Sequence, residues 1–254
     1  MASFWPATIR ARSGGSPDGG PPRTIHPVTN VLNVLAMRYG YHRLATNVHR
    51  MSDLVAWSRS LARRYLDIPQ FRMTRWRHVQ AVAASATRVS PICGADRDLV
   101  IAAAWLHDIG YSPRLVQTGF HPVDGALFLD GLGADSRIVS LVAHHSAAYA
   151  EAELRGLTSH YLQWADSEGP ATDVLWFADM TTSFTGEPVQ FDGRVLDIRR
   201  RWGPDHTVTR AIEASAPRLR AAIARTITGA EKHRLRIDIP DVNQDDLASP
   251  RSSR

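Results

Sequence analysis

The sequence predicts an all-α protein with one helical domain and loose ends. Apolar residues recur at intervals of three and four along most of the chain, and proline or glycine ends each such segment. No run of alternating β-branched residues stands out against this pattern. Apolar residues make up 44% and charged residues 22% of the 254 positions, which is ordinary for a globular protein and enough for one well-filled domain.

The predicted helices each begin or end at a recognisable signal, such as a serine or aspartate cap or a following proline. The last one contains Pro217 and is expected to be interrupted there. In chain order, the predicted helices cover approximately residues 52–65, 74–89, 98–108, 122–131, 135–148, 172–180, 192–202 and 207–228.

The chain divides into four parts. Residues 1–50 contain a stretch rich in Gly and Pro, and they are interpreted as a disordered basic extension, as an over-long start before Met51, or as a targeting peptide. Residues 51–185 are expected to form the main helical domain, and residues 186–236 are expected to be C-terminal helices packed on it. Residues 237–254 are polar and broken by proline, which predicts a loose tail.

The most apolar helix, over residues 98–106, leads directly into His107-Asp108-Ile109-Gly110. A charged aspartate and a histidine at the end of a buried helix are costly unless something pairs with them. Two interpretations follow. The pair satisfies itself and the nearby backbone, or it holds a metal ion.

Other histidines and a second aspartate favour the metal interpretation. By helical spacing, His78, His145 and Asp179 share faces with apolar residues of their own helices, whereas His144 lies nearer to the edge. His121 immediately precedes a proline that begins a helix. Each residue alone has an ordinary explanation as a surface histidine, a turn residue or an ion-pair partner. A single metal centre accounts for all of them together.

The ordered pattern resembles the HD superfamily of metal-dependent phosphohydrolases over about residues 50–185, so the main domain is identified as an HD-type metal-binding helical bundle. The resemblance implies a minimal set of ligands for one metal ion: His78, His107, Asp108 and Asp179. It also implies ligands for a second ion, His121 with His144 or His145, and Asp108 would then bridge the two ions. The motifs are similar to those of the HD-GYP branch and of small proteins that hydrolyse dinucleoside tetraphosphates. Tyr111 and Ser146 stand where HD-GYP members have a lysine and an acid, which argues against a cyclic-dinucleotide substrate.

The resemblance implies hydrolysis of a phosphomonoester or phosphodiester, with a nucleotide as the expected small substrate. One or two divalent ions would activate the attacking water, and histidine ligands favour Mn, Fe, Co, Ni or Zn over Mg. Asp108 would orient the attacking water, and His121 would hold the second ion or protonate the leaving group. The candidate substrate-binding residues are Arg75, Arg77, Arg114 and Thr182. Two alternatives share the ligand set: a di-iron oxygenase, and a non-catalytic regulatory protein that holds a structural metal.

Charge and cysteine content exclude several other classes. The formal net charge of +5 arises almost entirely in residues 1–50, because the rest of the chain holds equal numbers of acidic and basic residues. Stable binding to nucleic acid is therefore not expected. The only lysine, Lys232, excludes a phosphate-binding P-loop in the core. The only cysteine, Cys93, excludes a disulfide framework and favours the cytoplasm, and no apolar stretch is long enough to suggest a membrane partner. The oligomeric state stays open.

Overall fold

The computed structural model describes residues 51–240, so the predictions for residues 1–50 and 241–254 lie outside the described residues. The described part is helical throughout and contains no strand, only an isolated antiparallel bridge between Thr182 and Pro188. The all-α prediction is confirmed. No described helix is long and apolar enough to cross a membrane.

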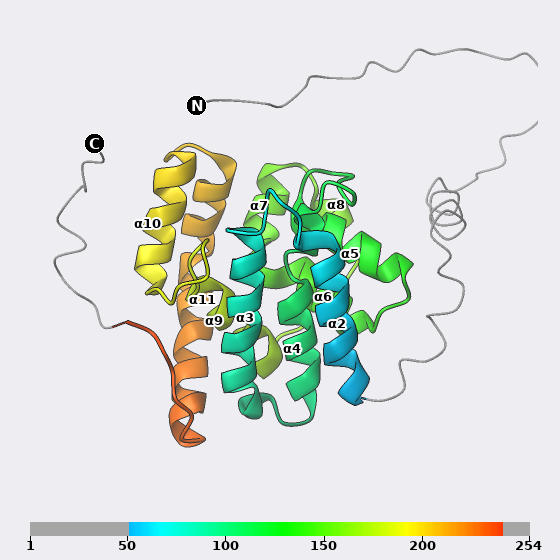
Figure 1. The fold of residues 1–254 in the computed structure, drawn as a ribbon. Coiled ribbons are helices and arrows are strands. Elements are labelled where there is room, and N and C mark those ends of the chain that lie inside the picture. Colours follow the sequence, from blue (N-terminus) through cyan, green and yellow to red (C-terminus); the bar gives the residue numbers. More distant parts are fainter. Residues whose placement is uncertain (1–50, 241–254) are drawn as a thin grey trace, which may run out of the picture. The chain divides into compact units, whose positions relative to one another are not determined.

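Figure 1 shows the helices in sequence order. The α-helices are α2 (Met51–Leu66), α3 (Arg75–Val89), α4 (Arg97–Leu106), α5 (His121–Gly131), α6 (Ser136–His144), α7 (Tyr149–Leu154), α8 (Thr158–Tyr161), α9 (Pro170–Met180), α10 (Phe191–Trp202) and α11 (Thr207–Lys232). The 3-10 helices are η1 (Ser90–Asp96), η2 (Ile109–Tyr111) and η3 (His145–Ala147). The predicted bounds of α2, α3, α4, α5 and α10 agree with the structure to within about two residues.

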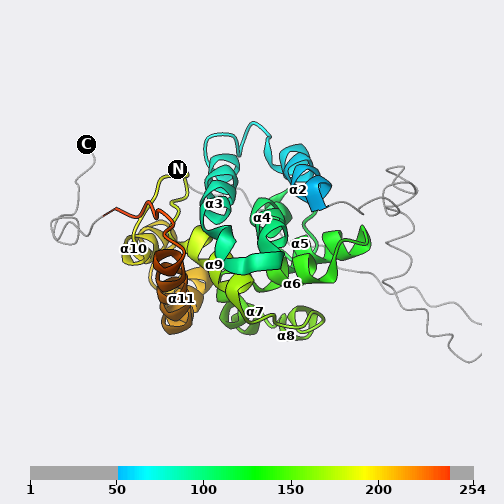
Figure 2. The same ribbon diagram turned by 90° about the horizontal axis from the view of Figure 1, so that it is seen from below.

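Helix α4 lies in the centre of the described domain. Every residue from Leu99 to Ala104, and also Leu106, is buried. A helix that is apolar all round must be covered on all sides, and α4 packs against α2, α3, α6 and α9 (Figure 2). The next two residues, His107 and Asp108, therefore lie buried in the middle of the domain.

The C-terminal helices α10 and α11 pack against the rest of the domain through α9 and α7. Helix α11 lies along α9 and α7, and α10 packs against α11 (Figures 1 and 2). After α11 the chain continues with Ile237 and Ile239, which pack against the core. Within residues 186–236, α11 therefore covers one side of α9, and α10 packs on α11.

Three predicted helix boundaries are wrong. The helix predicted over 135–148 ends at His144, because the backbone turns to positive φ at Ser146 and Ala147. Helix α9 begins at Pro170, where proline's fixed φ suits the first helical turn, rather than being capped by Thr172. Helix α11 continues through Pro217, an exposed residue, so water can hydrate the carbonyl that proline leaves without a partner.

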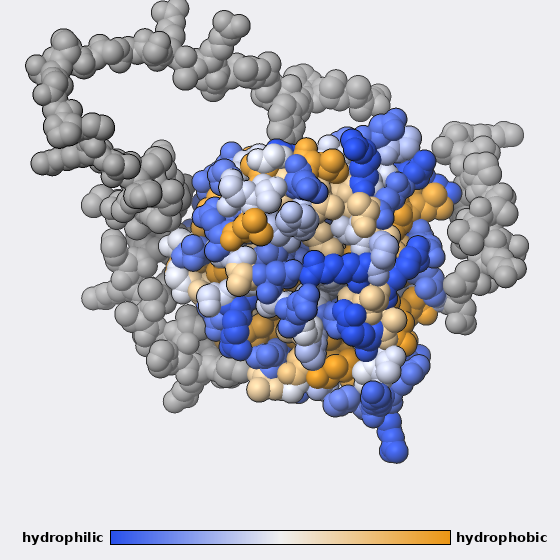
Figure 3. Space-filling view, turned by 180° about the vertical axis from the view of Figure 1, so that it is seen from behind, coloured by the Kyte–Doolittle hydropathy of each residue, from blue (hydrophilic) through white to orange (hydrophobic). Residues whose placement is uncertain are grey.

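The surface seen in Figure 3 mixes hydrophobic and hydrophilic residues over the whole face. Among the described residues, the exposed large hydrophobic side chains are spread over several elements; they are Met73, Val116, Tyr149, Leu154, Leu162 and Trp202. Single exposed hydrophobic residues of this kind are normal on a globular protein. Trp202 differs from the others because it lines the cavity that is described below.

Helix α5 approaches η2 at a pair of glycines. A Cβ atom added to Gly110 would lie 2.0 Å from the carbonyl oxygen of His121 and 2.6 Å from the backbone nitrogen of Gly125. Only glycine allows the two backbones to come this close. The contact positions the first residue of α5, His121, relative to Asp108.

Gly110→Ala is expected to lower the free energy of unfolding by about 3 kcal/mol or more, because backbone atoms must move to admit the methyl group. Gly193→Ala in α10 is the matched control, since nothing lies within 4 Å of its added Cβ. The control is expected to be neutral or slightly stabilising. Urea unfolding of both variants measures the difference, and equal stabilities would contradict the close approach.

Candidate metal centre

Six predicted ligands gather into two adjacent triads. The first triad is His78, His107 and Asp179, and the second is Asp108, His121 and His145. Within each triad, one ligand atom from every residue lies within 4.8 Å of the others. The ligands come from α3, the end of α4, α5, η3 and α9, so elements far apart in sequence converge on one place.

The first triad is buried, and only Asp179 of its three residues lines a cavity. His78 Nε2 lies 3.0 Å from Asp179 Oδ1, and His107 Nε2 lies 3.9 Å from the same oxygen. Both imidazoles are buried with no exposed surface, and His107 Nε2 has no hydrogen-bond partner within the described residues. A buried ring nitrogen without a partner lowers the stability of the fold unless a hydrogen-bond donor or a metal ion binds to it.

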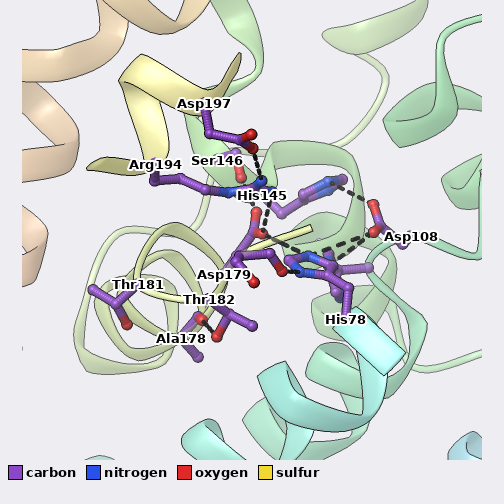
Figure 4. Close-up of polar contacts among 12 residues, drawn as sticks. His78, Asp108, His145, Ser146, Ala178, Asp179, Thr181, Thr182, Arg194 and Asp197 are labelled. Atoms are coloured by element: carbon purple, nitrogen blue, oxygen red, sulfur yellow. Dashed lines mark hydrogen bonds and ion pairs between the residues drawn. The ribbon is translucent and has the colours of Figure 1, made fainter. Parts of the chain in front are cut away.

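Asp108 joins the two triads through its two carboxylate oxygens. Its Oδ2 lies 3.3 Å from His107 Nε2 and 3.7 Å from His78 Nε2. Its Oδ1 lies 3.4 Å from His121 Nε2 and 3.9 Å from His145 Nε2. Figure 4 shows His78, Asp108 and Asp179 directed toward one another. This is the arrangement that a carboxylate bridging two cations requires.

Hydrogen bonds to the backbone fix the orientation of three imidazoles. His107 and His145 each follow a helix end and donate from Nδ1 to a carbonyl three residues earlier, at 2.8 Å and 2.6 Å. His78 donates from Nδ1 to the carbonyl of Ser183 at 2.8 Å. A carbonyl only accepts, so Nδ1 holds the proton and Nε2 keeps a free lone pair. Backbone carbonyls commonly orient metal-binding histidines in this way.

Burial and charge favour the ligand forms of most of these side chains. The exception is His107, because burial lowers its pKa but Asp108 and Asp179 outweigh burial and raise the pKa. Burial lowers the pKa of His78, His121 and His145, and the neighbouring His145 lowers that of His121 further, so neutral imidazole predominates. Burial opposes ionisation of Asp108, but Arg75 and His107 outweigh it and hold the pKa of Asp108 well below its usual range. Neutral imidazoles and ionised carboxylates are the forms that bind divalent cations.

The comparison with protein families agrees with this geometry. Residues 75–170 match the HD domain. This segment is an HD domain. The match spans five of the six clustered residues, and Asp179 follows shortly after it on α9. The HD superfamily is a superfamily of metal-dependent proteins, and these clusters are its metal-binding candidates here.

A stretch of 76 residues is also 41% identical to the tRNA (cytidine(56)-2'-O)-methyltransferase of Thermoplasma volcanium. The match covers 30% of this chain and 22% of that protein, so the chain spans about a fifth of its relative's length. No solved structure matches.

His144 and His145 have different places in the HD domain. His145 lies in the second triad, with Nε2 3.0 Å from His121 Nε2. His144 points away from both triads, and its Nε2 donates to the carbonyl of Trp164 at 2.9 Å. The choice that the sequence left open therefore falls on His145 as the candidate ligand.

His145→Ala is expected to reduce bound metal by about one ion per chain, because the second triad loses one of its two imidazoles. His144→Ala is the matched control. It should keep the full metal content and cost only about 1 kcal/mol of stability through the lost hydrogen bond. Elemental analysis of the two purified variants decides. Equal metal loss in both would refute the assignment.

The predicted substrate-binding residues are dispersed. Arg75 contacts Asp108 and lines the cavity at the triads. Arg77 is exposed, and Arg114 lies over the ring of Tyr65 at 5.0 Å, away from this cavity. Thr182 donates to the carbonyl of Ala178 at 2.7 Å and lines a separate small cavity (Figure 4). Of these four candidates, the structure brings only Arg75 to the HD-domain site.

Three further side chains at the site were not predicted to act there. The Ser146 hydroxyl donates to Asp179 Oδ2, and the Tyr111 ring stacks on His121 with centroids 3.9 Å apart. Arg194 reaches from α10 to within 4.0 Å of Asp179 Oδ1 (Figure 4). Ser146 and Tyr111 stand out in the sequence as departures from the HD-GYP pattern, whereas no sequence signal points to Arg194.

The two triads open into a cavity of about 350 Å³. Helices of the HD domain form one side of this cavity, and α10 and α11 form the other, so the cavity depends on the C-terminal helices. Its size falls in the range of small-molecule binding sites. The lining includes three arginines, Arg75, Arg194 and Arg201, beside the candidate metal ligands.

Proposed function

We propose that this chain is a metal-dependent phosphohydrolase that uses a binuclear centre to hydrolyse a phosphomonoester or phosphodiester of a nucleotide. The observation that carries the proposal is the placement of Asp108, whose two oxygens face two separate sets of imidazoles. Divalent ions held by these residues would supply electrostatic stabilisation of a phosphoryl transfer and would lower the pKa of a water molecule.

Each side chain then has a defined task. His78, His107 and Asp179 would hold one ion, and His121 and His145 would hold the other. Asp108 would contribute an oxygen to each position and would orient the attacking water. Because Arg75 contacts Asp108 and lines the cavity, its guanidinium is close enough to neutralise phosphate oxygens at the centre. The ring of Tyr111 lies 3.9 Å from the Arg75 guanidinium and steadies it.

The ligand chemistry favours transition metals. The six clustered residues provide four imidazoles and two carboxylates. Imidazole suits Zn, Fe, Ni and Cu, whereas Mg prefers oxygen ligands. We therefore expect Mn, Fe, Co, Ni or Zn rather than Mg. The cytoplasmic location expected from the single cysteine stays a prediction.

The proposal is tested by assaying the full chain, loaded separately with Mn, Co, Ni and Zn, against nucleoside monophosphates, dinucleoside polyphosphates and model phosphodiesters. Release of phosphate or a nucleotide, abolished in Asp108→Asn, supports it. Iron-dependent oxygen uptake without release of phosphate would indicate the oxygenase chemistry instead. Full metal content with neither activity would favour a regulatory role.

A further inference from the structure

We propose that α10 adds a phosphate-binding subsite to the cavity, centred on Arg194, which lies outside the residues that match the HD domain. The inference rests on the proposed function, since it names a group that holds the substrate of that site. Three observations support this subsite. Arg194 is buried, two of its guanidinium nitrogens have no hydrogen-bond partner among the described residues, and two other arginines line the same cavity.

Arg194 is a buried cation without sufficient partners. The residue is 6% exposed, and neither Nε nor Nη1 has a hydrogen-bond partner within the described residues. The nearest carboxylate oxygens belong to Asp197, 3.6 Å from Nη1, and Asp179, 4.0 Å from Nη2. Asp197 is itself bound by Arg201 at 3.0 Å. A buried guanidinium whose N–H groups have no acceptor strongly destabilises the fold unless an anion accepts hydrogen bonds from it.

The wall around Arg194 favours an anion. Arg75 and Arg201 line the same cavity, and both guanidiniums lie over the ring of Phe184, at 5.3 Å and 4.6 Å. The acid on this wall that is not a candidate ligand, Glu151, is bound by Arg155 at 2.7 Å. The planar guanidinium fork matches the oxygens of a phosphate better than a chloride or a single carboxylate oxygen.

The rest of the lining indicates what the phosphate is attached to. Beside the arginines, the cavity wall has an apolar part; it is formed by Phe184, Ile198, Trp202, Val208 and Ile212. Trp202 is 48% exposed, which leaves part of its ring open to contact. We infer that the ligand is a small phosphate ester, with its phosphate between the metal centre and Arg194 and a compact organic group on the apolar wall.

A structural role as counter-ion of Asp179 is the competing explanation for Arg194. That role predicts lost metal when Arg194 is changed, whereas the subsite predicts lost anion affinity with the metal retained. Metal content and phosphate affinity are measured separately, and neither measurement requires hydrolysis. A negative result for the subsite can therefore be distinguished from a negative result for the proposed hydrolase activity.

The test is binding of inorganic phosphate to the full, metal-loaded chain, measured by calorimetry alongside elemental analysis. Arg194→Gln should weaken phosphate binding by about 10- to 100-fold at unchanged metal content, and Arg194→Lys should weaken it less. Arg199→Gln is the matched control, because this α10 residue pairs with Glu213 on the exposed surface and does not line the cavity. It should bind phosphate as the wild type does.

Unchanged phosphate affinity in Arg194→Gln, or loss of metal together with affinity, would overturn the subsite. If the substitutions prevent folding, a crystal structure of the wild-type chain with phosphate decides instead. The expected result is a phosphate oxygen within about 3.2 Å of the Arg194 guanidinium. A phosphate bound only at the metals, or no bound phosphate, would overturn it.

Discussion

Asp108→Asn is expected to remove metal from both triads and to lower phosphate-ester hydrolysis by roughly a thousand-fold or more. Asparagine keeps the size of the side chain but offers only one carbonyl oxygen and no charge. The wild-type carboxylate faces imidazoles of both triads and has Arg75 as a partner. One substitution therefore weakens two sites, in contrast to His145→Ala, which should weaken only one.

Asp130→Asn on α5 is the matched control, because this aspartate is exposed and belongs to neither triad. It should retain both the metal content and the rate. Elemental analysis and steady-state kinetics on the two variants make the comparison. If Asp108→Asn kept one metal per chain, the two triads would bind independently and Asp108 would not be a bridging ligand.

Removal of metal from the wild-type chain is expected to abolish hydrolysis and to lower the midpoint of thermal unfolding. The metal-free centre keeps two carboxylates and four imidazoles crowded in a buried space. At a free metal concentration of 100 times Kd, binding stabilises the folded state by about 2.7 kcal/mol per site, which corresponds to a shift of about 5–10 °C for a domain of this size.

Thermal unfolding before and after dialysis against a chelator measures this shift, and re-addition of Mn or Zn should restore both the midpoint and the activity. Asp108→Asn serves as the control, since a chain without the bridging ligand should show little change on chelation. A wild-type midpoint that does not respond to chelation would argue against metal binding at the two triads.

The candidate ligands could be recognised in the sequence because their signals are local. His107-Asp108 follows a helix apolar on every face, and Asp179 lies on an apolar helix face, so burial could be inferred without the fold. His144 and His145 could not be separated in this way. The helical spacing predicted through Ala148 ends at His144, where Ser146 and Ala147 adopt positive φ. The orientation of His145 depends on that local backbone change.

Arg194 illustrates what sequence patterns could not reveal. It stands three residues before Asp197 on a helix rich in arginine, a pattern typical of a solvated face. Arg194 is buried because α11 packs along α9 and α10 packs on α11, which places Arg194 beside the candidate ligand Asp179. Similarly, Arg77 and Arg114 are close to the ligands in sequence but do not line the cavity. Arg77 points in a different direction from Arg75 on the same helix, and Arg114 lies in the turn after η2.

The most direct test of the binuclear centre is anomalous diffraction from crystals of the full chain loaded with Mn or Zn. We expect two anomalous peaks per chain, about 3.5–4 Å apart, one on each side of the Asp108 carboxylate. One triad would surround each peak, with the four imidazoles bound through Nε2. A single peak, or peaks located away from Asp108, would contradict it.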